Sequence, residues 1–225
     1  MASRIVDPKP QAARVLIVDD HPIVRQGLSL LIEQEPDLMV CGEADDAKGA
    51  MESIAETSPD IVIVDIMLKE TSGIDLIKKI RARWANLPIL VMSMYDESLY
   101  AERALRAGAS GYITKEEATD KTLTVIRKVL GGEIHLSPMM VSRILQKISG
   151  GKGRGGSSLD RLTDRELQVF HMIGQGLGTR QIAERLNVSV KTVEAYRAHI
   201  KDKLKLASST EVMRHAVQWV QGGNL

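Results

Sequence analysis

The chain has 225 residues, enough for two modest domains that each bury a hydrophobic core. Its formal net charge is only +1, but residues 1–149 carry 18 Lys/Arg against 22 Asp/Glu, whereas residues 150–225 carry 12 against 7. This split of −4 against +5 is typical of a control unit joined to a unit that binds nucleic acid or another polyanion, although chance asymmetry on two solvated surfaces gives the same numbers.

The single cysteine, Cys41, excludes an internal disulfide and a cysteine-based zinc site, which indicates a reducing compartment. Residues 1–13 are polar and contain two prolines, so they predict a loose tail and not a secretory signal. No apolar run reaches the roughly 20 residues of a membrane span. We therefore expect a cytoplasmic protein with no membrane partner.

Strand and helix patterns alternate five times between residues 14 and 130. Short β-branched apolar runs predict buried strands at 14–18, 38–44, 61–64, 87–92 and 111–114. Amphipathic patterns predict helices at 21–34, 46–57, 73–84, 96–107 and 118–130. The alternation predicts an α/β fold, a doubly wound five-stranded parallel sheet of the flavodoxin-like type. No G-x-G-x-x-G or Walker lysine motif follows a strand, which disfavours nucleotide binding.

The pattern becomes all-helical toward the C-terminus. A further helix is predicted at 135–148, and five glycines within residues 150–158 predict a flexible tether. A capping box from Thr163 to Glu166 opens a helix that ends near residue 173, and the remaining helices are expected at 179–186, 190–204 and 209–220. We therefore predict a tail at 1–13, an α/β domain at 14–132, a linker helix and tether at 133–158, and a smaller all-α helix-turn-helix domain at 159–225.

Polar side chains stand at the carboxyl ends of four predicted strands: Asp19 and Asp20, Asp65, Ser93 and Lys115. In a parallel sheet these ends converge on one edge, where α/β proteins place their ligands. Three clustered carboxylates require a cation, and all-oxygen ligation suits Mg²⁺. A carboxylate such as Asp65 can then hold a phosphoryl group, with Ser93 and Lys115 binding its oxygens. The alternative for each residue alone is ordinary: a helix cap, a turn serine or a solvated lysine.

Several stretches resemble the receiver domain of two-component response regulators. They are Val18-Asp19-Asp20-His21, the isolated Asp65, Ser93, and Gly108-Ala109-Ser110-Gly111-Tyr112-Ile113-Thr114-Lys115. The resemblance implies that Asp65 takes a phosphoryl group from a sensor histidine kinase. It also implies that Mg²⁺ is bound by Asp19, Asp20, Asp65 and the backbone carbonyl of Met67, that Ser93 and Lys115 hold the phosphoryl group, and that the rotamer of Tyr112 reports it. The chain keeps Gly73 but has Glu116 and Lys69 where the family usually has proline.

The C-terminal region resembles the LuxR-type helix-turn-helix, so the whole chain is similar to the NarL/FixJ class of response regulators. The matching stretches are 162–166, 176–186 and 191–200. The resemblance implies a homodimer formed through the helix at 209–220 on a roughly palindromic site in double-stranded DNA, with RNA polymerase as a further partner. It also implies an inactive state in which the receiver covers the DNA-reading helix.

Helical spacing divides the predicted reading helix, residues 190–204, into two faces. Val193, Tyr196, Ile200 and Leu204 are expected to face the core. The other face is expected to enter the major groove, where Lys191 and Glu194 can read base edges. The full set of candidate DNA contacts is Arg180, Lys191, Thr192, Glu194, Ala195, Arg197, Ala198, Lys201 and Lys205, with Arg180, Arg197, Lys201 and Lys205 assigned to phosphates. The alternative is a solvated helix face of mixed charge.

These patterns predict a transcription regulator that is switched by phosphorylation of Asp65 and has no catalytic residues. The main alternative is a DNA-binding regulator that works without phosphorylation and uses its receiver as a protein-interaction module. A phosphatase of the haloacid dehalogenase type also forms an aspartyl phosphate, but it needs a second aspartate two residues on, where this chain has Met67. The site is therefore expected to store a phosphoryl group.

Overall fold

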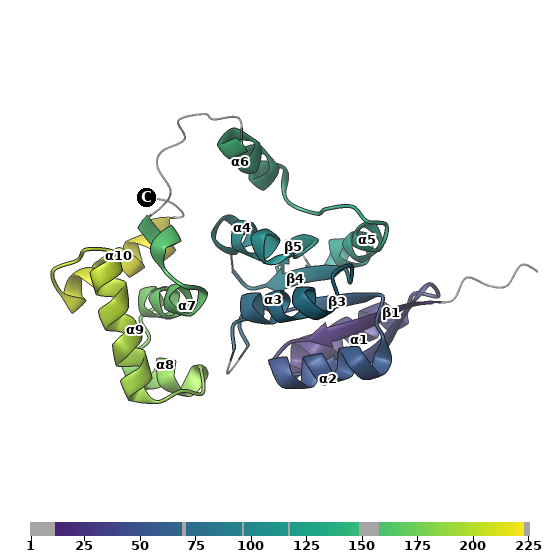
Figure 1. Cartoon of the computed structure of the whole chain (residues 1–225), viewed down its shortest axis with the longest axis horizontal. Helices are drawn as coiled ribbons and strands as arrows, with labels where there is room; N and C mark the ends of the chain where they lie inside the picture. The colour runs from purple at the N-terminus through teal and green to yellow at the C-terminus, as the bar shows by residue number, and fades with distance from the viewer. Residues whose placement is uncertain (1–11, 69–70, 96, 117, 149–157, 223–225) are drawn as a thin grey trace, which may run out of the picture.

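A computed structural model describes residues 12–68, 71–95, 97–116, 118–148 and 158–222 (Figure 1). Most of the predicted N-terminal tail and nearly all of the predicted tether therefore lie outside the described residues. Within the described residues, no helix combines the length and apolar character needed to cross a membrane.

The N-terminal half is a five-stranded parallel sheet, as predicted. Its strand order is β2-β1-β3-β4-β5. The strands are β1 (Ala13–Val18), β2 (Leu38–Ala44), β3 (Ile61–Val64), β4 (Ile89–Ser93) and β5 (Gly111–Thr114). The helices between and after them are α1 (Pro22–Glu33), α2 (Ala47–Thr57), α3 (Gly73–Arg83), α4 (Glu97–Ala107) and α5 (Ala118–Leu130). The order reverses direction at β1 and β3, which places a crevice at the carboxyl ends of these two strands.

Alternate side chains of the central strands enter two separate cores. Val15 and Ile17 of β1 pack in the core under α1 and α5, whereas Leu16 and Val18 pack in the core on the side of α2, α3 and α4. Both faces of the sheet are covered, which explains why β3 is apolar at every position. Ile23, an apolar residue in the first turn of α1, is 83% exposed and belongs to neither core.

The linker helix is shorter than predicted. Helix α6 spans Pro138–Ile148 and does not begin at residue 135. His135 instead pairs in parallel with Gly111 at the edge of the sheet, because its N–H donates to the carbonyl of Ser110 at 3.1 Å and its carbonyl accepts from the N–H of Tyr112 at 2.9 Å. The following Ser137 N–H donates to the buried Glu97 side chain at 2.8 Å, which attaches the start of α6 to α4.

The C-terminal domain is helical, as predicted, after a short 3-10 turn at Ser158–Arg161. Its helices are α7 (Asp164–Gly174), α8 (Thr179–Arg185), α9 (Val190–Lys203) and α10 (Ser209–Gly222). The capping box is confirmed: the Thr163 N–H donates to Glu166 at 2.7 Å, and the Glu166 N–H donates to the Thr163 hydroxyl at 3.3 Å. The turn between α8 and α9 makes this a helix-turn-helix.

Candidate functional site

Acidic side chains from the ends of β1 and β3 meet at the crevice. Asp19 and Asp65 are each 3% exposed, and Asp20 lies beside them at the start of the β1–α1 turn. These three residues and His21 each offer a ligand atom within 4.8 Å of the others. The acidic cluster is consistent with a metal site, because carboxylate oxygens are favoured ligands of hard divalent cations.

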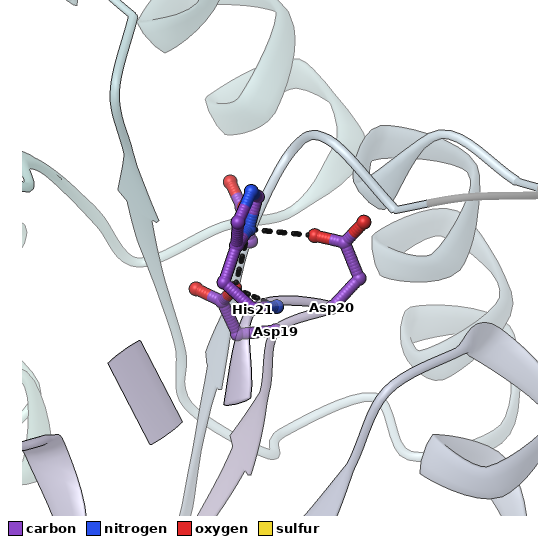
Figure 2. Close-up of side chains that lie close together, drawn as sticks. Asp19, Asp20 and His21 are labelled. Carbon is purple, nitrogen blue, oxygen red and sulfur yellow. Dashed lines mark hydrogen bonds and ion pairs between the residues drawn. The ribbon is translucent and has the colours of Figure 1, made fainter. Parts of the chain in front are cut away.

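His21 lies against both Asp19 and Asp20 (Figure 2). Its Nδ1 atom lies 3.1 Å from Asp19 Oδ1 and 2.8 Å from Asp20 Oδ1. The His21 N–H also donates to Asp19 Oδ1 at 2.9 Å, and Arg25 donates to the Asp19 carbonyl at 2.6 Å. The turn after β1 is therefore held by its own polar groups. The sequence predicted no separate role for His21, which was named only within the motif at residues 18–21.

Lys115 occupies the other side of the cluster. Its ammonium lies 2.5 Å from Asp19 Oδ2 and 2.8 Å from Asp65 Oδ2, so it acts as the internal counter-charge of two buried carboxylates. Burial raises the pKa of Asp65 to about 6, although the Lys115 charge opposes this rise. Burial alone lowers the pKa of Lys115, but the charges of Asp65 and Asp19 outweigh it and the pKa is raised.

The loop after β3 brings the backbone against Asp65. The Met67 N–H donates to Asp65 Oδ1 at 3.3 Å, and the Gly73 N–H donates to the Ile66 carbonyl at 2.8 Å. Helix α3 starts so close to this loop that a Cβ on Gly73 would stand 2.1 Å from the Asp65 carbonyl oxygen. Glycine is therefore the only residue type that fits this position without moving the end of β3.

Ser93 and Tyr112 converge on Tyr95. Ser93 is fully buried at the end of β4, and its hydroxyl accepts from the Tyr95 N–H at 3.3 Å. The Tyr112 hydroxyl donates to the Tyr95 carbonyl at 2.8 Å. Since the Lys115 N–H also donates to the Ser93 carbonyl at 2.7 Å, the ends of β4 and β5 form one hydrogen-bonded unit next to the acidic cluster.

Helix α9 presents the predicted polar face to solvent. Val193 and Ile200 are buried and Tyr196 and Leu204 are partly buried, as predicted for the core face. Of the candidate DNA contacts, the exposed residues are Arg180, Lys191, Glu194, Ala195, Ala198 and Lys205, and the partly exposed residues are Thr192, Arg197 and Lys201. Thr192 also takes part in the helix cap, because its N–H donates to the Ser189 hydroxyl at 3.0 Å.

The two halves of the chain meet through the start of the C-terminal domain and α7, whereas the resemblance implied only that the receiver covers the reading helix. Arg103 of α4 donates to the Leu162 carbonyl at 2.8 Å and to Asp164 at 3.0 Å, and Lys78 of α3 lies 3.0 Å from the same carboxylate. From α7, the fully buried Gln168 donates to the Ile66 carbonyl at 3.0 Å. A glutamine inside the apolar turns of α7 was the available signal, because a buried polar side chain needs a partner.

The fold and the site define a class of protein: a parallel α/β domain with an acidic cluster and a paired lysine, joined to a helix-turn-helix. A family profile described as "Response regulator receiver domain" matches residues 15–127, and one described as "Bacterial regulatory proteins, luxR family" matches residues 160–216. The chain belongs to the LuxR/NarL family of response regulators, which are DNA-binding transcription regulators and not enzymes. The receiver implies a histidine kinase partner.

Relatives span nearly the whole chain. "Oxygen regulatory protein NreC" of Staphylococcus carnosus (strain TM300) is 33% identical over 91% of this chain and 97% of its own length. "Transcriptional activator protein ExaE" of Pseudomonas putida is also 33% identical, over 91% of this chain and 95% of its own. Among solved structures, RcsB from Salmonella enterica serovar Typhimurium, bound to promoter rprA with the phosphomimetic BeF3-, is 27% identical with a TM-score of 0.60 and covers 92% of this chain and 99% of that chain.

Proposed function

We propose that Asp65 accepts a phosphoryl group from a sensor histidine kinase and that this modification switches DNA binding. The observation that carries the proposal is the placement of Lys115 between Asp19 and Asp65. Its ammonium group contacts one oxygen of each buried carboxylate. In the transfer, an Asp65 oxygen forms a bond to phosphorus as the phosphorus–nitrogen bond of the phosphohistidine breaks. The phosphohistidine ring carries a proton on its other nitrogen, so the electron pair of the broken bond stays on the ring, the imidazole leaves as a neutral group, and the product is an acyl phosphate.

The acidic cluster fits Mg²⁺ as the cation of this reaction. Asp19, Asp20, Asp65 and the backbone carbonyl of Met67 are the proposed ligands, and their oxygen chemistry matches the preference of this ion. When bound, Mg²⁺ supplies charge that neutralises the carboxylates and the incoming phosphoryl oxygens. Lys115 then has a second role, because it can leave the Asp65 carboxylate and pair with a phosphoryl oxygen.

Ser93 and Tyr112 are the proposed reporters of phosphorylation. The Ser93 hydroxyl is buried at the same strand ends, so it is able to donate to a phosphoryl oxygen. Its present link to Tyr95, and the Tyr112 bond to the Tyr95 carbonyl, join the three residues. A change at Ser93 would therefore pass to the loop before α4 and shift the population of receiver conformations.

The proposed DNA surface is the exposed face of α9 with its flanking residues. Lys191, Thr192, Glu194, Ala195 and Ala198 are assigned to the major groove, and Arg180, Arg197, Lys201 and Lys205 to phosphates. We propose a homodimer formed through α10 on a roughly palindromic site, with RNA polymerase as a further partner. Solved structures of RcsB bound to a promoter and of RcsB dimers bound to DNA support the proposal that the chain binds DNA as a dimer.

We propose a receiver at residues 14–132, a linker at 133–158 and a DNA-binding domain at 159–225. The two family matches fall inside these limits, at residues 15–127 and 160–216. A regulator that meets a kinase and DNA works in the cytoplasm, which is the location we propose.

One experiment tests the proposal against the alternative of a phosphorylation-independent regulator. The full chain is incubated with Mg²⁺ and acetyl phosphate, and a base-labile phosphoryl adduct and binding to a random-sequence duplex library are measured. The expected result is an adduct that raises DNA binding and is lost in Asp65→Asn. If Asp65→Asn binds DNA with the same phosphodonor dependence as the wild type, the proposed switch is wrong. Binding that never depends on the donor supports the alternative.

A further inference from the structure

Two side chains of the DNA-binding domain hold the loop that follows the phosphoryl acceptor. Gln168 Nε2 donates to the Ile66 carbonyl at 3.0 Å, and Arg165 donates to the Leu68 carbonyl at 3.4 Å. Arg165 also donates to Gln168 Oε1 at 2.6 Å, which fixes the orientation of the glutamine amide. Ile66 and Leu68 flank Met67, so helix α7 binds the backbone on both sides of this residue.

The bond from Gln168 acts on the same peptide group that faces Asp65. The carbonyl of Ile66 and the N–H of Met67 belong to one planar trans peptide, so they point in opposite directions. Gln168 and the Gly73 N–H both donate to the carbonyl side of this peptide, at 3.0 and 2.8 Å. The N–H side points at Asp65 Oδ1, 3.3 Å away. A donor from the other domain therefore sets the direction of an N–H group in the acceptor site.

Both oxygens of Asp65 are occupied in this arrangement. Oδ1 accepts from the Met67 N–H, and Oδ2 accepts from Lys115. A phosphoryl group on Asp65 brings three further acceptor oxygens into the space where these two donors now lie. We expect the Ile66–Met67 peptide to turn or shift to make room for these oxygens, and this movement would strain its bond to Gln168.

We propose that Gln168, oriented by Arg165, is a positioning residue of the phosphoryl-acceptor site that is supplied by the DNA-binding domain. It holds the Ile66–Met67 peptide in the arrangement of the unphosphorylated chain. Docking of α7 and phosphorylation of Asp65 are therefore antagonistic: phosphorylation weakens docking, and docking disfavours the phosphorylated state by the same free energy. Docking is also expected to slow phosphoryl transfer, because the peptide has to leave the arrangement that Gln168 holds. The direction of this effect rests on the proposed function of Asp65.

This device differs from covering of the reading helix by the receiver. Lys191, Glu194 and Ala198 remain exposed while α7 is docked. The helix that is restrained is the first one of the domain, and the restraint acts on the acceptor loop. Docking in this structure thus controls the chemistry of Asp65 directly.

The test uses the full chain with two substitutions at one position. Gln168→Ala removes the donor, whereas Gln168→Glu keeps the shape and the acceptor for Arg165 but places an oxygen against the Ile66 carbonyl. The matched control is Gln175→Ala, which removes an exposed glutamine at the end of the same helix. Initial rates of adduct formation are measured with Mg²⁺ and acetyl phosphate, and hydrogen exchange is measured at the Met67 amide.

Both Gln168 variants are expected to form the adduct about fivefold faster than the wild type, which is the factor expected for the loss of one hydrogen bond. Hydrogen exchange at the Met67 amide is expected to be faster as well. Gln175→Ala is expected to match the wild type in both measurements. Wild-type or slower rates in both Gln168 variants, with Met67 exchange unchanged, would overturn the inference. If the wild type forms no adduct that depends on Asp65, the proposed function fails instead, and Met67 exchange still decides whether Gln168 holds the loop.

Discussion

Replacing Arg103 by alanine is expected to separate the two domains. The Arg103 guanidinium donates to the carbonyls of Leu159 and Leu162, both at 2.8 Å, and to Asp164 at 3.0 Å. All three acceptors lie at the start of the DNA-binding domain, so one side chain of α4 fastens this domain to the receiver. Alanine removes the three donors at once and leaves partly buried acceptors to be filled by water.

The expected size of the effect follows from the three hydrogen bonds. A hydrogen bond contributes about 1 kcal/mol net, and somewhat more when one partner is charged. Arg103 is 19% exposed, so solvent recovers part of the loss. Lys78 remains 3.0 Å from Asp164 and keeps that carboxylate paired. We therefore expect the docking equilibrium to shift by roughly 3 kcal/mol, which is about 150-fold.

The assay combines small-angle X-ray scattering with hydrogen exchange. Arg103→Ala should increase the radius of gyration of the full chain and speed exchange of the amides in 158–164, while the core strands stay protected. The matched control is Arg106→Ala, one turn along the same helix, whose side chain is 78% exposed and pairs with Glu102. That surface pair contributes about 0.5 kcal/mol or less. If Arg103→Ala gives the same dimensions and exchange as Arg106→Ala, Arg103 does not hold the domains together.

Three further predictions concern packing, pH and DNA. Gly73→Ala should destabilise the receiver by roughly 3 kcal/mol in urea unfolding, since its Cβ would stand 2.1 Å from the Asp65 carbonyl; a loss below about 0.5 kcal/mol contradicts this. Burial lowers the pKa of His171 to about 4, so the unfolded chain binds the proton more readily, and the contribution of His171 to stability should fall by roughly 3 kcal/mol from pH 7 to pH 4, while the raised pKa of Asp65 acts in the opposite direction. The difference in stability between the wild type and His171→Phe should therefore change by about this amount over the same range, and a constant difference refutes the prediction. Arg197→Ala should reduce the salt slope of DNA binding by about one, whereas Lys48→Ala, which removes an exposed charge from the receiver, should not; equal slopes exclude Arg197 from the interface.

The convergence of polar side chains at the strand ends was predictable because it depends on the sheet alone. In a parallel sheet the carboxyl ends of neighbouring strands lie on one edge, so residues that follow apolar runs come together whatever the loops do. Asp19, Asp65 and Lys115 meet in this way, at 2.5 and 2.8 Å. The role of Gly73 is equally local, because α3 starts directly against the end of β3.

The start of the linker helix was not predictable from spacing. The apolar and polar positions from residue 135 onward continue the helical pattern, but His135 finds hydrogen-bond partners on both sides of Gly111 at the sheet edge. The hydrogen bonds of His135 to the edge of the sheet thus outweighed the helix propensity of this segment. Helix α6 then begins at Pro138, a residue type that favours the first position of a helix. Periodicity reports which residues are apolar, and it does not report which neighbour is within reach.

The contact between the domains was unpredictable for a related reason. Residues Glu166–Ile173 of α7 are all buried, so every face of this helix is covered. A sequence shows that such a helix is central, but it does not show which partner covers each face. Only the structure reveals that Gln168 and Arg165 contact the loop after β3, at the carbonyls of Ile66 and Leu68. The rings of Phe170 and of Trp219 in α10 pack together with their centroids 5.6 Å apart.

The chemistry of the two faces of α7 explains how its docking can be reversible. The face toward α10 is apolar and close-packed: a Cβ on Gly174 would stand 2.4 Å from the Ala216 carbonyl, so this contact belongs to the permanent core. The face toward the receiver carries Arg165, Gln168 and His171 at three-residue spacing. The His171 ring meets the Tyr95 ring edge-on, with the two ring centroids 4.3 Å apart. Water can satisfy these polar groups when the domains part, which keeps the free energy of separation small. The proposed phosphorylation of Asp65 therefore acts on the polar face of α7, through the Gln168 bond to the Ile66 carbonyl, and leaves the contact between α7 and α10 intact.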